Sequence, residues 1–143
     1  MPQSIIIILT QQHEDLMSSL VHVKALTVAD SLAGGEIVKK LSEFKKMLSG
    51  HVGLENTTFY PQLLKLKKER GMDVVKTEEF MGKMADINDQ VNVFLKKYDS
   101  GQKVFRDLSV FKVELSDITD ILNLRIEAEE SFVFVDWEML NNK

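Results

Sequence analysis

The sequence predicts an all-α fold, an antiparallel four-helix bundle whose helices run up, down, up and down. Apolar residues recur at steps of three and four along four long segments, which is the spacing of one helix face. Only 2 prolines and 7 glycines interrupt the 143 residues, and short turn signals separate the segments. Valine and isoleucine follow the same helical spacing, so strands are not expected. We expect a single domain over residues 1–143.

The composition is that of an ordinary globular chain, and it argues against several classes of function. Hydrophobic residues make up 44% and charged residues 28% of the chain, which is too apolar for disorder. The net charge of -4, with acids and bases mixed, argues against a nucleic-acid surface. The absence of cysteine excludes disulfides and thiolate metal sites and fits the cytoplasm, where we expect the protein. The apolar run Ile5–Leu9 is too short to span a membrane, and no catalytic motif indicates an enzyme.

The first segment runs from about Ser4 to Asp30 and carries one ionisable residue on its apolar face. Its stripe steps by three and four residues through Ile6, Leu9, His13, Leu16, Leu20, Val23 and Thr27. His13 therefore lies in the middle of a face that should point into the core. The glycines of Ala33-Gly34-Gly35 predict the end of this helix, because glycine is the usual residue just past a helix C-terminus.

The second segment starts near Glu36 and carries two ionisable residues on its stripe. That stripe consists of Leu41, Phe44, Leu48, His51, Glu55, Phe59, Leu63 and Leu66. His51 and Glu55 are four residues apart, so they lie one above the other on the helix. A buried carboxylate needs a partner, because burying it unpaired costs on the order of several kcal/mol. Pro61 falls inside the pattern and predicts either a kink or the start of a new helix, and Gly71 predicts the end of the helix.

The third segment, from about Val74 to Tyr98, carries no histidine or acid on its stripe. The stripe consists of Thr77, Phe80, Met84, Ile87, Val91, Phe94 and Tyr98. The turn signal Asp99-Ser100-Gly101 follows it. We expect this helix to offer no ligand to a polar site in the core.

The fourth segment, from about Lys103 to Phe134, alternates steps of three and four without exception. Its stripe consists of Leu108, Phe111, Leu115, Ile118, Leu122, Arg125, Glu129 and Phe132. Arg125 and Glu129 replace apolar residues in this core stripe. The tail that follows is expected either to extend the helix or to pack Trp137 over the end of the bundle.

Positions along the bundle axis predict that the polar residues of the stripes meet. His13 precedes the glycine turn by roughly as many residues as His51 and Glu55 follow it, so a rise of about 1.5 Å per residue brings them level. We expect His13, Glu55 and Glu129 in one layer, with His51 and Arg125 about one turn away. Two imidazoles and two carboxylates in an apolar core are typical of a transition-metal centre.

Several pieces of the sequence, in this order, resemble the hemerythrin-like (HHE cation-binding) domain family. The pieces are Gln12-His13-Glu14, His51-x-x-x-Glu55, Phe59-Tyr60-Pro61 and the run from Arg125 to Glu130. The resemblance covers nearly the whole chain. It implies a non-haem iron centre, often with two irons. Such a centre binds or senses dioxygen or another small ligand, or it responds to redox state or iron supply. The metal ligands that the resemblance implies are His13, His51, Glu55 and Glu129.

The sequence departs from the family pattern in the third and fourth helices. The third helix lacks its usual histidine, and Arg125 stands where the fourth helix usually offers one. Arginine stays protonated and cannot bind a cation, but it can replace a metal's charge by pairing with Glu129 or Glu55. Two readings therefore remain open. One is a mononuclear or incomplete di-iron centre, and the other is a metal-free interaction or signalling bundle with a buried arginine–carboxylate network.

The surface of the predicted bundle offers fewer signals. The glutamates beside the stripes are expected to be solvated or to lie at interfaces: Glu14, Glu127 and Glu130. The apolar residues Ile5–Ile8 and the ring of Trp137 are candidates for the face of a homodimer. The sequence indicates no particular protein partner.

Overall fold

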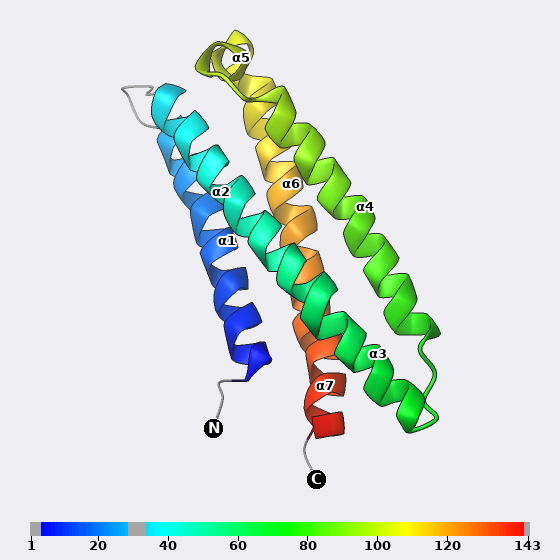
Figure 1. Cartoon of the computed structure of the whole chain (residues 1–143). Helices are drawn as coiled ribbons and strands as arrows, with labels where there is room; N and C mark the ends of the chain where they lie inside the picture. The colour runs from blue at the N-terminus through cyan, green and yellow to red at the C-terminus, as the bar shows by residue number, and fades with distance from the viewer. Residues whose placement is uncertain (1–3, 29–33, 142–143) are drawn as a thin grey trace.

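The computed structural model describes residues 4–28 and 34–141, and it contains only helices and no strand in those ranges. The all-α prediction is therefore confirmed (Figure 1). None of the helices in these ranges combines the length and the apolarity that crossing a bilayer requires. In chain order the elements are α1 (Ile5–Thr27), α2 (Gly34–Leu54), the π-helical turn η1 (Glu55–Phe59), α3 (Tyr60–Glu69), α4 (Val75–Lys97), α5 (Gly101–Arg106), α6 (Leu108–Ala128), the π-helical turn η2 (Glu129–Val133) and α7 (Phe134–Asn141).

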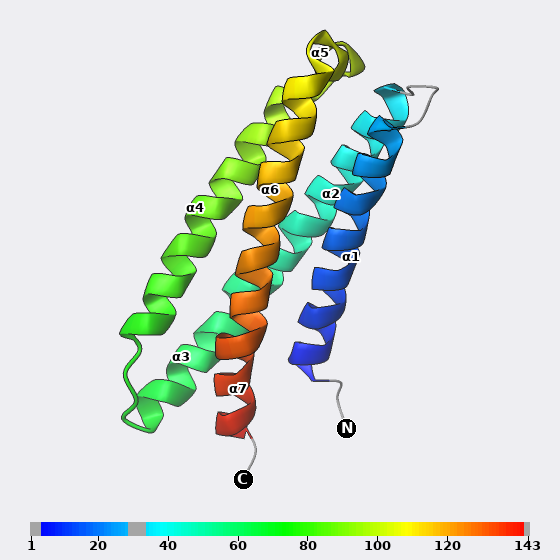
Figure 2. The same ribbon diagram turned by 180° about the vertical axis from the view of Figure 1, so that it is seen from behind.

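The long helices lie side by side in both views of the molecule. Figures 1 and 2 show α3 continuing the line of α2 and α7 continuing that of α6. Helix α1 packs against α2 and α6, and α4 packs against the same two helices. The end of α1 and the short α5 lie at one end of the molecule, and the start of α1 and the end of α7 lie at the other (Figure 1). The middle turns of α1, α2 and α6 therefore face a common central layer.

The first turn of the chain differs from the predicted one. Helix α1 ends at Thr27, three residues before the expected Asp30, and Gly34 begins α2 instead of following the end of α1. Asp30 and Ala33 lie outside the described residues.

The fourth predicted helix is divided into two. Asp107 separates α5 from α6, and its Oδ1 accepts a hydrogen bond of 3.2 Å from the backbone N–H of Val110. This is the usual geometry of an aspartate at a helix N-cap, which satisfies a donor that the helix itself cannot. The long helix of the candidate site therefore begins at Leu108 instead of Lys103.

The predicted apolar stripes are buried along α1 but shift by one residue near the end of α6. All seven residues of the α1 stripe are buried. On the last helix Ile126 and Val133 are buried, whereas Arg125 is half-buried and Phe132 is 70% exposed. A strict alternation of three and four assumes 3.5 residues per turn, and a straight α-helix drifts from that repeat by about 20° per heptad. The drift moves Arg125 and Phe132 off the inward face, while Glu129 stays on it.

Both acid-bearing stripes contain a π-helical turn that begins at the acid. The N–H of Tyr60 donates to the carbonyl of Glu55, five residues back, and the N–H of Phe134 donates to that of Glu129 in the same way. Pro61 follows in the first turn of α3, where its missing N–H is tolerated. The irregularity expected at Pro61 therefore appears as the π-helical turn just before it.

Two apolar clusters fill the core, and the polar residues of the stripes lie between them in sequence on each helix. The cluster on the α5 side includes Leu16, Leu20, Phe44, Leu48, Phe111, Leu122 and Ile126. The cluster on the side of the chain ends includes Ile6, Leu9, Phe59, Tyr60, Val133, Phe134 and Trp137. The central layer is thus enclosed by hydrocarbon on both sides, which lowers the local dielectric and strengthens every electrostatic interaction inside it.

Trp137 belongs to the second cluster. It is 9% exposed, and its ring centroid lies 5.0 Å from that of Phe59. The tail therefore extends the helix as α7 and also packs Trp137 against the bundle, as expected, and little of the ring is left exposed for a dimer face. Of the other residues suggested for that face, Ile6 is buried, while Ile7 and Ile8 are exposed.

A buried lysine joins three helices at the chain-end side of the molecule. Lys67 on α3 is 5% exposed, and its Nζ donates to Thr77 Oγ1 on α4 and to Asp136 Oδ2 on α7, both at 2.8 Å. Replacing Lys67 by methionine keeps the volume but removes both bonds, so we expect the free energy of unfolding to fall by about 1–2 kcal/mol. Urea denaturation measures this, with Lys65→Met at an exposed position of the same helix as control. Equal losses in both variants would contradict the structural role.

Candidate metal centre

Four ionisable side chains converge in the central layer. One ligand-type atom from each of His13, His51, Glu55 and Glu129 lies within 4.8 Å of the others, and all four residues are buried. They come from α1, α2, η1 and η2. The sequence placed His51 one turn away from the other three, but the structure places it among them. Arg125, which was expected beside it, has its guanidinium over the ring of Phe80 on α4.

The two histidines approach the two carboxylates with the same nitrogen. His13 Nε2 lies 2.9 Å from Glu129 Oε1, and His51 Nε2 lies 3.3 Å from Glu55 Oε1. The His13 contact lacks the geometry of a hydrogen bond, because Glu129 Oε1 has no hydrogen-bond partner although it is buried. Glu55 Oε2, the oxygen of Glu55 that does not face His51, is buried without such a partner as well. Buried polar atoms are normally paired, so two unpaired carboxylate oxygens in one layer indicate a missing positive partner.

The π-helical turns place the two acids in this layer. Glu55 and Glu129 each occupy the first position of such a turn, and each is followed by aromatic residues that anchor the turn in the apolar cluster. Single π-helical turns within α-helices occur frequently at functional sites, where they re-aim a side chain without ending the helix. The two halves of the site thus share one local design.

Three further side chains contact the group, and the sequence alone did not single them out as site residues. Glu130 Oε2 lies 2.7 Å from His13 Nδ1, and Gln12 Oε1 lies 2.7 Å from His51 Nδ1. The Tyr60 hydroxyl donates to Glu129 Oε2 at 2.5 Å. The expectation that Glu130 is only solvated or at an interface is therefore wrong. Its place directly after Glu129, and that of Gln12 directly before His13, are the signals that were available.

Burial and mutual contact set the protonation of the acids. Burial, together with the neighbouring Glu129, raises the pKa of Glu55 to about 11. Burial alone would raise the pKa of Glu129 as well, but contacts with His13, Glu55 and Tyr60 hold it below its ordinary value. One acid of the metal-free site is therefore protonated at neutral pH while the other is charged, as expected when like charges compete for one site.

The two histidines also differ from one another. Burial alone would lower the pKa of His13, but contacts with Glu129 and Glu130 outweigh it and raise that pKa. Burial and the neighbouring His13 lower the pKa of His51 to about 4. The metal-free layer thus holds a proton on Glu55 at neutral pH and favours the protonated form of His13, and a bound cation would displace these protons.

Arg125 does not neutralise the carboxylates. Its guanidinium carbon lies 4.5 Å from the ring centroid of Phe80, and the described residues show no ion pair between it and Glu55 or Glu129. The expected pairing of Arg125 with the buried acids is therefore wrong. Because position 125 has drifted to the edge of the core stripe, its long side chain stacks on an aromatic ring of α4 instead.

Helix α4 contributes no ligand, as its apolar stripe suggested. A small, mostly apolar cavity of about 10 Å³ lies between it and the two histidines, with Met84, Ile87, Asn88 and Val91 on its α4 side. That volume is close to the minimum that one water molecule requires. The centre therefore has four ligand residues on three sides and, on the fourth, a mostly apolar wall in which Asn88 is the one polar side chain from α4.

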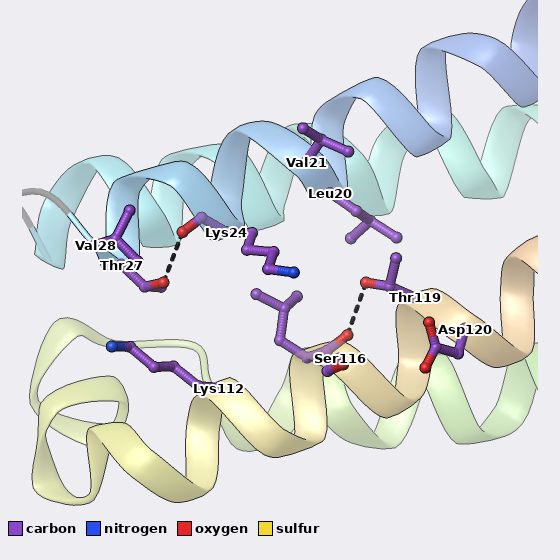
Figure 3. Close-up of a pocket in the computed structure, with 10 residues that line it drawn as sticks. Leu20, Val21, Lys24, Thr27, Val28, Lys112, Ser116, Thr119 and Asp120 are labelled. Atoms are coloured by element: carbon purple, nitrogen blue, oxygen red, sulfur yellow. Dashed lines mark hydrogen bonds between the residues drawn. The ribbon is translucent and has the colours of Figure 1, made fainter.

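A different cavity, of about 190 Å³, lies between α1 and α6 toward the α5 end (Figure 3). Its threonine hydroxyls donate to their own helices, Thr27 to the carbonyl of Lys24 at 2.6 Å and Thr119 to that of Leu115 at 2.7 Å. Its walls bring together no group of histidines and acids, so it offers none of the chemistry of the central layer.

Comparison with family models, with curated proteins and with solved structures finds no match to this chain. The candidate centre is therefore argued from its own geometry. The donor set of two imidazole nitrogens and two carboxylates suits divalent iron, manganese or zinc, since these cations accept both nitrogen and oxygen ligands. The two unpaired oxygens, Glu55 Oε2 and Glu129 Oε1, give such a cation the negative partners it needs.

Proposed function

We propose that this chain is a hemerythrin-like, antiparallel up-down-up-down four-helix bundle that binds iron at the central layer. The observation that supports it most is the group of four buried side chains with two unpaired carboxylate oxygens. The ordered motifs around His13, His51 and Glu129 point to the same family. A cytoplasmic location, which the cysteine-free composition favours, is part of this proposal.

The centre holds one metal ion. A pair of ions a few ångströms apart needs bridging carboxylates and further terminal ligands on each side. Here four ligand residues lie within 4.8 Å of one another, α4 adds no histidine or acid to the group, and the guanidinium of Arg125 lies on Phe80. Four ligands complete most of the shell of one ion and leave a position open for a small ligand.

The role proposed for this ion is to bind or sense a small ligand such as dioxygen, or to report redox state or iron supply. Iron supplies one-electron chemistry and an affinity for such ligands when it is bound. The chain itself holds Glu129 in place through Tyr60 and excludes bulk water with two apolar clusters. No nucleophile with an activating base lies in the layer, so a binding role fits the site better than catalysis.

Anaerobic titration of the purified protein with Fe²⁺, followed by metal quantitation, tests the proposal. We expect about one equivalent to be retained by the parent protein and less than about a tenth by His13→Ala, because removing one of four ligands in a closed layer opens the shell. His22→Ala is the matched control, since His22 lies on the same helix and is exposed. A parent protein that retains less than about a tenth of an equivalent of any transition metal would refute the function.

A metal-free interaction module remains the second candidate. An exposed apolar row favours it: Phe132, Val135 and Met139 follow one another at steps of three and four and are 70%, 44% and 67% exposed. If this row or the exposed Ile7 and Ile8 join two copies, sedimentation velocity at high concentration detects a dimer. A monomer that binds iron favours the metal centre, and a dimer without metal favours the interaction module.

A further inference from the structure

Each histidine of the candidate centre is held from behind by a side-chain oxygen. Glu130 Oε2 lies 2.7 Å from His13 Nδ1, and Gln12 Oε1 lies 2.7 Å from His51 Nδ1. An oxygen acceptor at this distance requires the facing ring nitrogen to carry the hydrogen. In a neutral imidazole the lone pair is then on Nε2, and in both rings Nε2 is the atom that faces the carboxylates.

We propose that Gln12 and Glu130 are positioning residues that orient His51 and His13 so that both Nε2 atoms face a single divalent metal ion. This inference rests on the proposed function. Metal-binding histidines commonly donate their second ring N–H to a carboxylate or a carbonyl oxygen, which fixes the tautomer and the direction of the ring. Here both rings already have that partner before any ion is bound.

The chain builds this arrangement twice from neighbouring residues. Gln12 and His13 are consecutive on α1, and Glu129 and Glu130 are consecutive on η2. In each pair one residue points into the layer and the next lies at its flank, because consecutive helical residues differ by about 100° in direction. Gln12 crosses from α1 to a histidine of α2, and Glu130 crosses from η2 to the histidine of α1. Each pair therefore gives the centre one inward-facing side chain and one orienting group.

The two orienting groups differ in charge, so their effects should differ. Glu130 carries a carboxylate, and a charge-assisted hydrogen bond is about twice as strong as a neutral one. Its side chain is 38% exposed, so its loss leaves no large cavity in the core. Gln12 offers a neutral amide oxygen and lies half-buried. We expect the metal affinity to depend on both residues, and more strongly on Glu130.

The probe is Co²⁺, whose visible absorption reports both binding and coordination geometry. Glu130→Ala and Gln12→Ala are expected to weaken Co²⁺ binding by about 10–100-fold, the usual effect of losing a partner of a ligating histidine. Both should also alter the visible bands at saturation, which a loss of stability alone would not do. Glu130→Gln keeps an oxygen acceptor at the same place and should restore most of the affinity.

The chain offers matched controls for both changes. Glu127→Ala removes an exposed glutamate one turn earlier on α6, and Gln11→Ala removes an exposed glutamine beside Gln12. A parent that binds no Co²⁺ refutes the proposed function. If the parent binds but both test variants bind as the parent does, the positioning role is refuted and the proposed function stands. Equal losses in Glu130→Ala and Glu127→Ala would also overturn it, because a general charge effect would then explain the result.

Discussion

Replacing Glu55 by glutamine is expected to stabilise the metal-free protein by about 3–4 kcal/mol at pH 7 while abolishing metal binding. The carboxyl group of Glu55 has a pKa near 4.5 when it is free, and burial beside Glu129 raises that pKa to about 11. Folding at pH 7 must therefore protonate it, and each pH unit between 4.5 and 7 costs about 1.4 kcal/mol. A glutamine is neutral at no such cost, because its amide does not ionise.

The same substitution removes a ligand, so stability and metal binding should change in opposite directions. Urea denaturation in the presence of a chelator measures the first, and Co²⁺ titration measures the second. Glu138→Gln on α7 is the control, because that glutamate is exposed and outside the layer. A Glu55→Gln protein that is less stable than the parent would show that the acid is paired in the metal-free fold, and that its burial does not destabilise that fold.

Parts of the fold and of the candidate site can be predicted from the sequence, because they depend on local spacing alone. The stripes of α1, α2 and α4 follow from the requirement that each helix bury one face, which is a property of local spacing. The positions of His13, His51, Glu55 and Glu129 follow from the same spacing, because each of them replaces an apolar residue at a core position. A polar residue that faces the core has lost its hydrogen bonds to water, so it needs a partner from another helix.

The flanking residues of the site could not be predicted in this way. Gln12 and Glu130 lie beside the stripes, at positions where polar residues are normally solvated, and only the crossing of helices brings them to the imidazoles. Tyr60 occupies a core position that an apolar ring would fill equally well, so its hydroxyl contact with Glu129 depends on the π-helical turn before it. These contacts join different helices, so the spacing of residues along one helix does not predict them.

Arg125 shows how a small error in helix periodicity changes a chemical conclusion. A repeat of 3.5 residues places it on the stripe one turn from Glu129, where it would clamp the acids and exclude a cation. A straight α-helix rotates slightly less than two full turns per heptad, so Ile126 takes the core position and Arg125 reaches Phe80. Among the described residues no arginine or lysine forms an ion pair with either acid, which is why the centre suits a metal ion better than the sequence suggested.

The stability of the metal-free protein is expected to fall as the pH rises above about 6.5. The folded protein keeps a proton on Glu55 up to a pKa of about 11 and holds the pKa of His13 above its ordinary value of 6.5, whereas the unfolded chain releases both earlier. The folded state then binds more protons than the unfolded state, so the free energy of unfolding decreases by about 1.4 kcal/mol per proton and pH unit. From pH 6.5 to 8.5 the loss is about 3 kcal/mol from Glu55 alone.

His51 acts in the opposite direction at lower pH. Its pKa is lowered to about 4, so the folded protein binds fewer protons than the unfolded chain between pH 4 and 6.5. The contribution of His51 to the free energy of unfolding therefore rises with pH in that range. In that range it offsets Glu55, which predicts a nearly flat stability profile before the decline. Metal binding displaces the protons of Glu55 and His13, so Co²⁺ affinity should rise over the pH range in which the metal-free protein loses stability. Urea denaturation at a series of pH values tests this, and Glu55→Gln should remove most of the slope. A stability that increases from pH 6.5 to 8.5 would show that the layer is not protonated when empty, and metal binding would then release no protons.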